Sequence, residues 1–275
     1  MQKELGDSGI SATLVVPLYG RAEITRRFPG FLKDDEAVRL VETLPYDFSA
    51  VREEYKGEYW LAASAARAYR FDRAVKEYAG KHPKTVVVNI GAGLDTTFLR
   101  VDNGGITWYD LDLPDVIKIR KSVIKETERS HCIAASAFDT AWFDQIPFKK
   151  EDGILFLAGG FFYYFKPEDN ARLAAELAKR FPGGELLFDA CSKAGVKIAN
   201  KKVADSGNKD AEMFFYVNDK KELYAWSENI AEVEIMPLYS AAARKGAKWN
   251  ALTKINMFFG DLFKMTRLAR IRFKD

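Results

Sequence analysis

Histidine, cysteine and long apolar runs are scarce in this sequence, and each scarcity excludes a class of function. The 275 residues include two histidines, His82 and His131, so a zinc site built on histidine is not expected. The two cysteines, Cys132 and Cys191, do not form a C-x-x-C pair, and we expect free thiols in a reducing, cytoplasmic setting. No apolar run approaches the ~20 residues that a membrane-spanning helix needs.

Charge and signature motifs narrow the possibilities further. The formal net charge is +3, and Lys and Arg are interspersed with Asp and Glu, so no basic field favours nucleic acid. A G-x-S-x-G motif is missing, which argues against an ordinary serine hydrolase. The opening MQKELGDSGI lacks the apolar core of a secretory signal. We expect neither nucleic acid nor a membrane as a partner, and the sequence leaves the oligomeric state open.

The strongest pattern lies in residues 85–115, TVVVNIGAGLDTTFLRVDNGGITWYDLDLPD. Its β-branched start predicts a strand that is buried on both faces. The strand ends at Gly91 and Gly93, where a backbone without side chains can turn tightly and let a ligand approach. A second strand, ITWYDL, ends on Asp112. This order of strand, glycine turn, helix, strand and acid is typical of a nucleotide-binding unit, in which the carboxylate accepts hydrogen bonds from a ribose.

The glycine spacing by itself is a weak signal, because G-x-G occurs in many ordinary loops. Asp112 lies roughly 20 residues after the first glycine, as the dinucleotide-binding fingerprint requires. The third glycine of that fingerprint would fall at position 96, which is Thr96 here. This difference argues against NAD. Methyltransferases that use S-adenosylmethionine share the layout without the third glycine.

Two segments, VVNIGAGLDTTFLR and WYDLDLPDVIKIRK, resemble the leucine carboxyl methyltransferase family. That family includes the protein phosphatase methyltransferases and the tetracenomycin-type polyketide O-methyltransferases. PLYGRAEITRRFPGFLKDDEA and AARAYRFD are similar to its bacterial branch, and the similarity covers nearly the whole chain, more faintly after residue 190. The resemblance implies a class I methyltransferase whose cofactor is S-adenosylmethionine.

The resemblance also implies which residues meet that cofactor. Gly91 and Gly93 would lie at its methionine moiety and Asp112 on its ribose. Arg67 occupies the place of the family arginine that binds the methionine carboxylate, and a guanidinium can hold a carboxylate through two hydrogen bonds. Arg21 is a second basic residue expected in the site, with a solvated helix face as the alternative.

Two positions depart from the family pattern. The acid–apolar pair that holds the adenine amine is replaced by Ser136 and Ala137, and Asp139 either substitutes for the acid or caps the next helix. A family glutamate that contacts the cofactor is replaced by Gly159. The following run contains Tyr163 and Tyr164, which either pack in the core or line the acceptor pocket.

We expect a single domain, 1–275, with a Rossmann-like sheet of seven strands, mostly parallel with an antiparallel last strand. An N-terminal helical cap, 1–80, and a lid insertion, 192–232, complete it. The strands are expected at 86–90, 106–111, 132–135, 153–158, 185–189, 233–239 and 268–273, and the clearest helices at 59–78, 114–124, 167–181 and 250–265. In the last helix Leu252, Ile255, Phe258, Phe259 and Leu262 recur at helical spacing, which predicts that they pack in the core.

The chemistry of methyl transfer decides the expected reaction. A carboxylic acid acceptor, with a pKa of ~4, is ionised at neutral pH and needs no general base, whereas a phenol, with a pKa of ~10, profits from one. No histidine lies near the predicted strand ends, and no acids cluster after the fourth strand to hold a metal. We therefore expect O-methylation of a small, polyketide-like carboxylate or hydroxyl, with no catalytic side chain identified. The alternatives are a degenerate methyltransferase fold that acts as a binding or regulatory module, and a protein C-terminal carboxyl methyltransferase.

Overall fold

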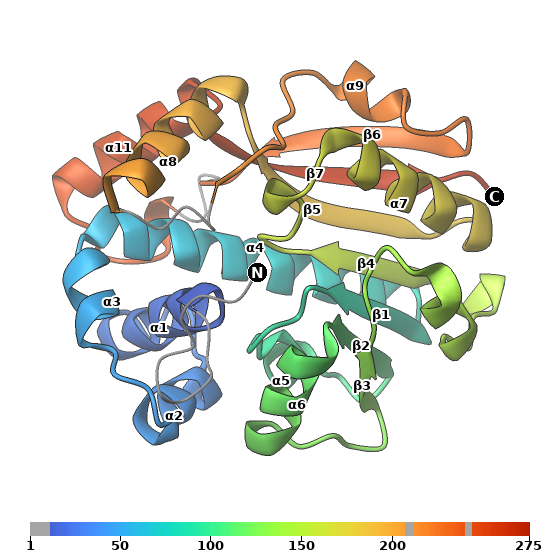
Figure 1. Cartoon of the computed structure of the whole chain (residues 1–275), viewed down its shortest axis with the longest axis horizontal. Helices are drawn as coiled ribbons and strands as arrows, with labels where there is room; N and C mark the ends of the chain where they lie inside the picture. Colours follow the sequence, from blue (N-terminus) through green and yellow to red (C-terminus); the bar gives the residue numbers. More distant parts are fainter. Residues whose placement is uncertain (1–11, 207–211, 240–243) are drawn as a thin grey trace.

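A single seven-stranded sheet runs through the molecule, with helices on both faces (Figure 1). The computed structural model describes residues 12–206, 212–239 and 244–275. The strands are β1 (Thr85–Ile90), β2 (Ile106–Asp112), β3 (Ser130–Ala134), β4 (Ile154–Ala158), β5 (Glu185–Cys191), β6 (Ile230–Pro237) and β7 (Thr266–Phe273). Their order is β3-β2-β1-β4-β5-β7-β6, and β7 runs antiparallel to both of its neighbours. The expected sheet, mostly parallel with an antiparallel last strand, is confirmed.

Local sequence signals explain where most helices begin. The helices are α1 (Ala12–Arg27), α2 (Asp35–Thr43), α3 (Ser49–Glu54), α4 (Glu58–Lys81), α5 (Thr97–Val101), α6 (Pro114–Val123), α7 (Pro167–Arg180), α8 (Lys193–Ser206), α9 (Lys220–Tyr224) and α11 (Ala251–Leu262). Proline stands in the first turn of α6 and α7, where its missing N–H costs nothing. The Asp34 side chain accepts a hydrogen bond from Ala37 N and so caps α2. Short 3₁₀ turns follow at η1 (Thr140–Gln145), η2 (Lys150–Asp152) and η3 (Phe162–Tyr164).

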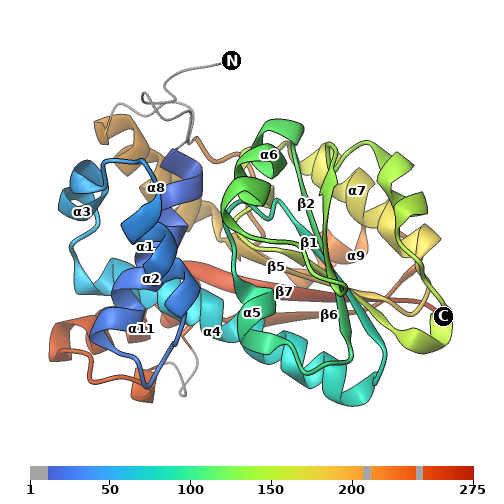
Figure 2. The same cartoon turned by 90° about the horizontal axis from the view of Figure 1, so that it is seen from below.

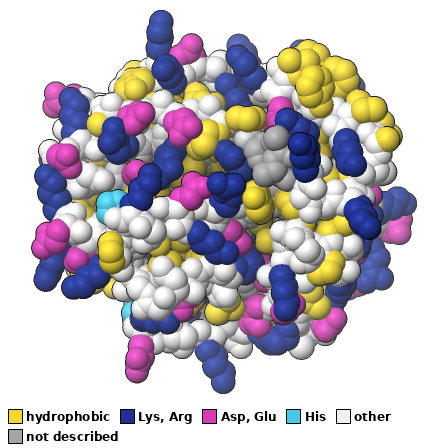
Figure 3. All heavy atoms as spheres, turned by 180° about the vertical axis from the view of Figure 1, so that it is seen from behind, with side chains coloured by type: hydrophobic (Ala, Val, Ile, Leu, Met, Phe, Trp, Pro, Cys, Tyr) yellow, Lys and Arg dark blue, Asp and Glu magenta, His cyan; other side chains and the backbone are white. Residues whose placement is uncertain are grey.

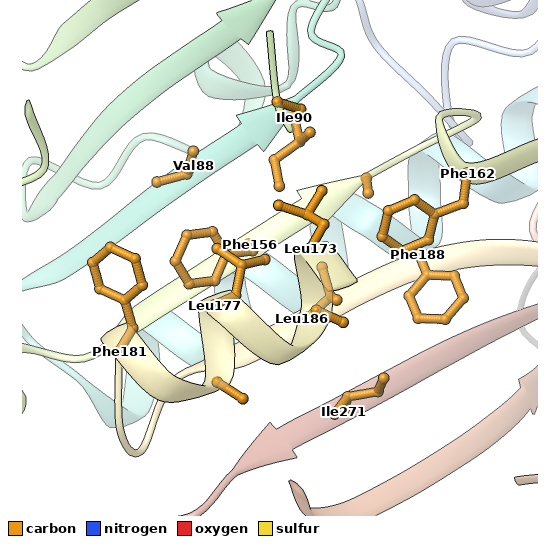
Figure 4. Close-up of a cluster of buried hydrophobic side chains, with 14 of the residues drawn as sticks. Val88, Ile90, Phe156, Phe162, Leu173, Leu177, Phe181, Leu186, Phe188 and Ile271 are labelled. Atoms are coloured by element: carbon orange, nitrogen blue, oxygen red, sulfur yellow. The ribbon is translucent and has the colours of Figure 1, made fainter. Parts of the chain in front are cut away.

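The sheet is buried on both faces because side chains alternate along each strand. Val88 and Ile90 of β1 point to the face covered by α7, where Leu173 and Leu177 pack against them (Figure 4). Val87 points to the opposite face and joins the cluster built on α4. This double burial is what the β-branched run predicts. No helix within the described ranges combines the length and the apolar character that crossing a bilayer requires.

The N-terminal helices α1, α2 and α3 lie together at one end of the molecule (Figure 2). A buried carboxylate, that of Asp34, joins α1 and α2 to the segment that follows β1. One of its oxygens accepts hydrogen bonds from Arg21 of α1 at 3.0 Å, from Arg100 of α5 at 2.6 Å and from Thr96 at 2.6 Å. Arg100 also forms two bonds with Asp72 of α4, at 2.9 and 2.8 Å. One network therefore joins the cap, the long helix and the helix that follows β1. Residues 1–11 of the predicted cap and 207–211 of the predicted lid lie outside the described residues.

Helix α11 contradicts the prediction that its aromatic residues pack in the core. Its buried residues are small or slender, namely Thr253, Met257 and Gly260. A Cβ on Gly260 would lie 3.0 Å from the hydroxyl oxygen of Tyr59 and 3.1 Å from the ring of Tyr239, so the helix packs through its backbone. The larger side chains face outward: Leu252, Ile255, Phe258, Phe259 and Leu262. Helical spacing correctly predicted one apolar face, but it could not tell which partner covers that face.

We predict that Asp34→Asn lowers the free energy of unfolding by about 3 kcal/mol, because it leaves two buried guanidinium groups without part of their counter-charge. Burial opposes ionisation of this carboxyl, but the attraction of Arg100 and Arg21 outweighs it and lowers its pKa. Urea denaturation of the two proteins at neutral pH measures the difference. Asp35→Asn, at an exposed neighbouring position, is the control and should change stability by less than ~0.5 kcal/mol. Equal stability of Asp34→Asn and the wild type would contradict a role for the network.

Candidate functional site

A cavity of about 830 Å³ opens at the carboxyl ends of the parallel strands. Backbone and side chains that follow β1, β2, β3, β4 and β5 form its floor, and helices α1, α3 and α4 form its opposite wall. Ligands of open α/β sheets bind at this edge, because the loops that leave neighbouring strands diverge there. The residues predicted from the sequence all line it: Arg21, Arg67, Gly91, Gly93, Asp112, Ser136, Ala137, Gly159, Tyr163 and Tyr164.

The turn after β1 presents bare backbone to this cavity. Gly91 has a φ of +68° and Gly93 a φ of +49°, in the left-handed region that disfavours side chains. A Cβ on Gly91 would also lie 2.4 Å from Cδ2 of Phe161, so the ring occupies the space that a side chain would fill. The N–H groups of Gly91 and Ala92 both donate to the carbonyl of Leu111, at 2.9 and 3.2 Å. The turn is therefore held directly against the end of β2.

Asp112 stands at the end of β2 beside this turn. Its Oδ2 accepts a hydrogen bond from Gly93 N at 2.8 Å, and its Oδ1 accepts one from Leu113 N at 2.7 Å. Each carboxylate oxygen has a second lone pair, so both can accept a further bond from a ligand in the cavity. Burial raises the pKa of this carboxyl, and the two backbone N–H groups partly offset that effect. The arrangement suits a vicinal diol, which donates two hydrogen bonds side by side.

A second acid, Asp110, supports the turn from below. Arg120 of α6 donates to it at 2.6 Å and to the carbonyl oxygens of Gly93 and Asp95 at 3.0 and 2.7 Å. Asn89 of β1 bridges the two acids, with bonds of 3.1 Å to Asp110 and 3.2 Å to Asp95. No role was predicted for Asp110, Arg120 and Asn89 from the sequence. Asp110 could have been noticed in the sequence, because residues two positions apart in a strand lie on the same face, and Asp110 therefore lies on the same face as Asp112.

Arg67 of α4 reaches the cavity from the opposite wall. Its Nη1 lies 3.3 Å from Oδ2 of Asp189, near the end of β5. Asp189 is 2% exposed and also accepts bonds from Gly160 N at 2.6 Å and from the Tyr163 hydroxyl at 3.1 Å. This carboxylate was missed at the sequence level, although an acid near the end of a parallel strand was a usable signal. The Asp189 carboxylate therefore connects α4, through Arg67, with the loop after β4, through Gly160 and Tyr163.

Arg21 lines the cavity, but its guanidinium is largely engaged. Besides its bond to Asp34, it donates to the carbonyl of Leu94 at 2.8 Å and lies 3.9 Å from Asp95. Burial raises the pKa of Asp95, whereas the attraction of Arg21 and Arg100 lowers it, and the net shift is downward. Arg21 thus helps to hold the segment that follows the glycine turn.

The two departures from the family pattern both lie at the cavity. Ser136 Oγ accepts a 3.3 Å bond from Phe138 N within the loop after β3. Asp139 does not line the cavity; its side chain accepts a bond from Ala141 N and caps η1, which is the second of the two roles considered for it. A Cβ on Gly159 would lie 3.4 Å from the ring of Phe71, which occupies the space beside it.

Aromatic side chains form part of the remaining lining of the cavity. Tyr163 is buried, whereas Tyr164 is 40% exposed. Across from them, the rings of Tyr55 and Trp60 lie 4.3 Å apart between centroids. Phe161 and Phe165, at 4.7 Å, continue this lining beside the loop after β4. Flat apolar molecules fit such a wall, because aromatic faces pack in offset or edge-on pairs.

The lining contains four carboxylates but no histidine among the described residues: Glu54, Asp95, Asp112 and Asp189. Of these, Asp95, Asp112 and Asp189 accept bonds from protein groups as described above. The described part of the chain has no group of three or more His, Cys, Asp or Glu placed to hold a metal ion. Cys132 and Cys191 are both free thiols, and burial raises the pKa of Cys191, which lines the cavity.

Two known methyltransferases are similar to this chain in sequence. Tetracenomycin polyketide synthesis O-methyltransferase TcmP from Streptomyces glaucescens is 29% identical over 184 residues, which are 66% of this chain and 66% of TcmP, just under two thirds of that protein. The S-adenosyl-L-methionine-dependent methyltransferase dpfgK from Gibberella zeae is 23% identical over 78% of both chains.

Solved structures share the fold at low sequence identity. A DUF574 family protein from Streptomyces avermitilis superposes with a TM-score of 0.63 at 13% identity, covering 98% of this chain and 99% of the other. The plantazolicin methyltransferase BamL, solved with a triazolic desmethylPZN analogue and S-adenosylhomocysteine, superposes with a TM-score of 0.50 at 11% identity, covering 96% of this chain and 99% of the other. The model of the leucine carboxyl methyltransferase family matches residues 19–178, more than half of the sequence. The chain therefore belongs to the leucine carboxyl methyltransferase family, whose methyl donor is S-adenosylmethionine.

Proposed function

We propose that this methyltransferase transfers the methyl group of S-adenosylmethionine to an oxygen of a small, flat, polyketide-like molecule, with a carboxylate as the preferred acceptor. One observation carries the proposal: a single cavity is lined both by the glycine turn with Asp112 and by aromatic side chains, Tyr55, Trp60 and Tyr164 among them. The glycine turn and Asp112 suit a nucleoside, and the aromatic side chains suit a flat organic molecule. The name of the relative TcmP supports oxygen as the acceptor atom.

In this proposal Asp112 holds the ribose. Both of its oxygens already accept one backbone N–H each, which fixes the carboxylate while leaving a lone pair on each oxygen. The methionine part lies over Gly91 and Gly93, whose positive φ angles keep side chains out of its path. Ser136 and Ala137 border the adenine, and a carboxylate is not needed there if serine accepts or relays the amine bond.

Arg67 would take the methionine carboxylate. Its side chain is 29% exposed, and its bond to Asp189 uses one of the five N–H donors of a guanidinium. Burial lowers the pKa of Arg67, but the neighbouring Asp189 outweighs this and raises it, so the group stays cationic. Arg21 stays a predicted cofactor residue, and we expect it to act chiefly by holding the segment after the glycine turn. Gly159 leaves the methionine amine to backbone carbonyls or water.

The lining favours a carboxylate acceptor over a hydroxyl. Bound S-adenosylmethionine supplies an already activated methyl group, so the chain mainly has to align the acceptor and exclude water. A carboxylate needs no deprotonation at neutral pH, whereas a phenol profits from a general base. No histidine lines the described cavity, Asp189 is already bonded to Arg67, Gly160 and Tyr163, and Glu54 is hydrogen-bonded to Tyr55. The proposed roles of Tyr163 and Tyr164 are therefore contact with the acceptor, not proton transfer.

Replacing Asp112 with Ala should weaken S-adenosylhomocysteine binding by at least ~100-fold, because two hydrogen bonds to a charged acceptor are lost and each is worth about 1.5–3 kcal/mol. Arg67→Gln should weaken it as well. Isothermal titration calorimetry measures both. Asp115→Ala, at an exposed position three residues further on, is the control and should bind as the wild type does. Unchanged affinity in Asp112→Ala and Arg67→Gln would contradict the assigned contacts.

The affinity for S-adenosylhomocysteine should fall in mild acid. The pKa of Asp112 lies above its usual range, so its carboxylate is protonated at a higher pH than that of an exposed aspartate. Protonation converts one accepting oxygen into a donor. Binding should be constant near neutral pH and weaken as the pH falls through this raised pKa, with Asp112→Asn lacking that step. The same acid dependence in Asp112→Asn would assign the step to another group.

Incubation of the protein with S-adenosylmethionine and matched aromatic acids and phenols tests the acceptor. We expect methyl esters of the acids, which mild alkali hydrolyses with release of methanol, and little methylation of the phenols. Mass spectrometry before and after alkali treatment distinguishes the alkali-labile ester from an alkali-stable ether. A mainly ether product would reverse the proposed preference. Cofactor binding without turnover of any acceptor would instead favour a binding or regulatory module.

A further inference from the structure

The outward side of α11 exposes six large apolar side chains in one continuous strip. They recur every three or four positions, so they share one face of the helix and its C-terminal end. They are Leu252 (66% exposed), Ile255 (51%), Phe258 (52%), Phe259 (46%), Leu262 (56%) and Phe263 (64%), and we call them the α11 face. In the view from behind, hydrophobic side chains gather at the upper right, where α11 lies (Figure 3). Exposed apolar patches of this size mark interaction surfaces.

The face belongs to a helix that is firmly anchored. Asn250 caps the helix by accepting a bond from Thr253 N at 2.7 Å, and its own N–H donates to Glu58 of α4 at 2.8 Å. At the other end, Asp261 accepts bonds from Tyr239 N at 3.0 Å and from Arg244 at 2.6 Å. The apolar side chains are thus exposed while their helix is fixed on α4, which is the geometry of a preformed docking surface.

We propose that the α11 face is the contact between two copies of this chain in a two-fold symmetric dimer. Six side chains at roughly half exposure offer about 600 Å² per copy, taking ~200 Å² for one large side chain. Two copies together would bury about 1,200 Å², the lower end of the range for specific interfaces, before any contribution from neighbouring residues. A two-fold axis would set the same apolar side chains of both copies against each other.

The charges on α11 itself favour a second copy over a lipid bilayer, and Lys245 and Lys248 lie in the segment before the helix. Residues 251–264 contain two lysines, Lys254 and Lys264, and one acid, Asp261, which is paired with Arg244. Surface-bound amphipathic helices carry many lysines and arginines, and recognition of anionic lipid takes clusters of about four to eight. Two cations beside an apolar centre instead match the polar rim and apolar core of a protein interface. The proposal does not depend on the proposed function.

Sedimentation velocity and light scattering of the purified full chain test this proposal. We expect the wild type to have twice the mass of one chain. Ile255→Glu, near the centre of the strip, should give a monomer, because it buries a charge against its counterpart. Leu99→Glu, at a 52% exposed position on α5, is the matched control and should remain a dimer. Circular dichroism and S-adenosylhomocysteine binding verify that each variant is folded.

Mixing opposite charges provides a second readout. Ile255→Glu and Ile255→Lys should each be monomeric alone and should associate when mixed at low salt, if the two faces meet. A wild-type monomer would overturn the proposal, and co-sedimentation of that monomer with vesicles containing phosphatidylserine would assign the face to a membrane. A dimer that persists unchanged in Ile255→Glu would overturn it too, since another surface would then hold the copies together.

Discussion

The carboxylate of Asp34 is the constraint on which the shape of the cavity depends. It lies between α1 and α5 and binds cations from both, Arg21 and Arg100, while a second acid, Asp72, ties Arg100 to α4. The wall of the cavity is made by helices that precede the sheet in sequence and share no backbone ladder with it. Charges buried at their junction allow essentially one arrangement, because any shift leaves a buried ion without its partner. The position of this wall relative to the sheet therefore depends on the ion pairs of Asp34 and Asp72.

The same principle acts on a smaller scale beneath the glycine turn. Two acids on the same face of β2 have different environments. Asp110 is buried and binds Arg120, whereas Asp112 lies at the end of the strand and keeps free lone pairs. Arg120 also binds two carbonyl oxygens of the turn, so the backbone that accompanies Asp112 cannot relax away from it. Asp112, the acid proposed to bind the ribose, is thus positioned with the help of a buried acid two residues earlier, Asp110. A ligand that uses Asp112 meets a preorganised acceptor and spends little free energy on ordering it.

Features formed by residues close together in the sequence were predictable, whereas contacts between residues far apart in the sequence were not. The strand, the turn at Gly91 and Asp112 are local features, and their residue types determined the sheet and one end of the cavity. The pairing of Arg67 with Asp189 joins positions 122 residues apart, so it leaves no spacing that a sequence pattern could reveal. The arginine was found through the family resemblance, and its carboxylate partner was missed. Long-range ion pairs appear when the fold is known, because topology decides which acids and bases meet.

Helix α11 illustrates a different limit. Hydrophobic periodicity indicates that one face of a helix is apolar. It does not indicate whether that face packs against the same chain or against another molecule. Here Gly260 allows the helix backbone to pack closely on Tyr59, so a narrow face is enough for attachment. The wider face, with Phe258 and Phe259, is then free of any task within the described fold. The monomer holds α11 in place but leaves this apolar strip exposed to water. Association with another molecule explains such a strip, and because the helix carries few charges, the same strip on a second copy is the partner that we favour.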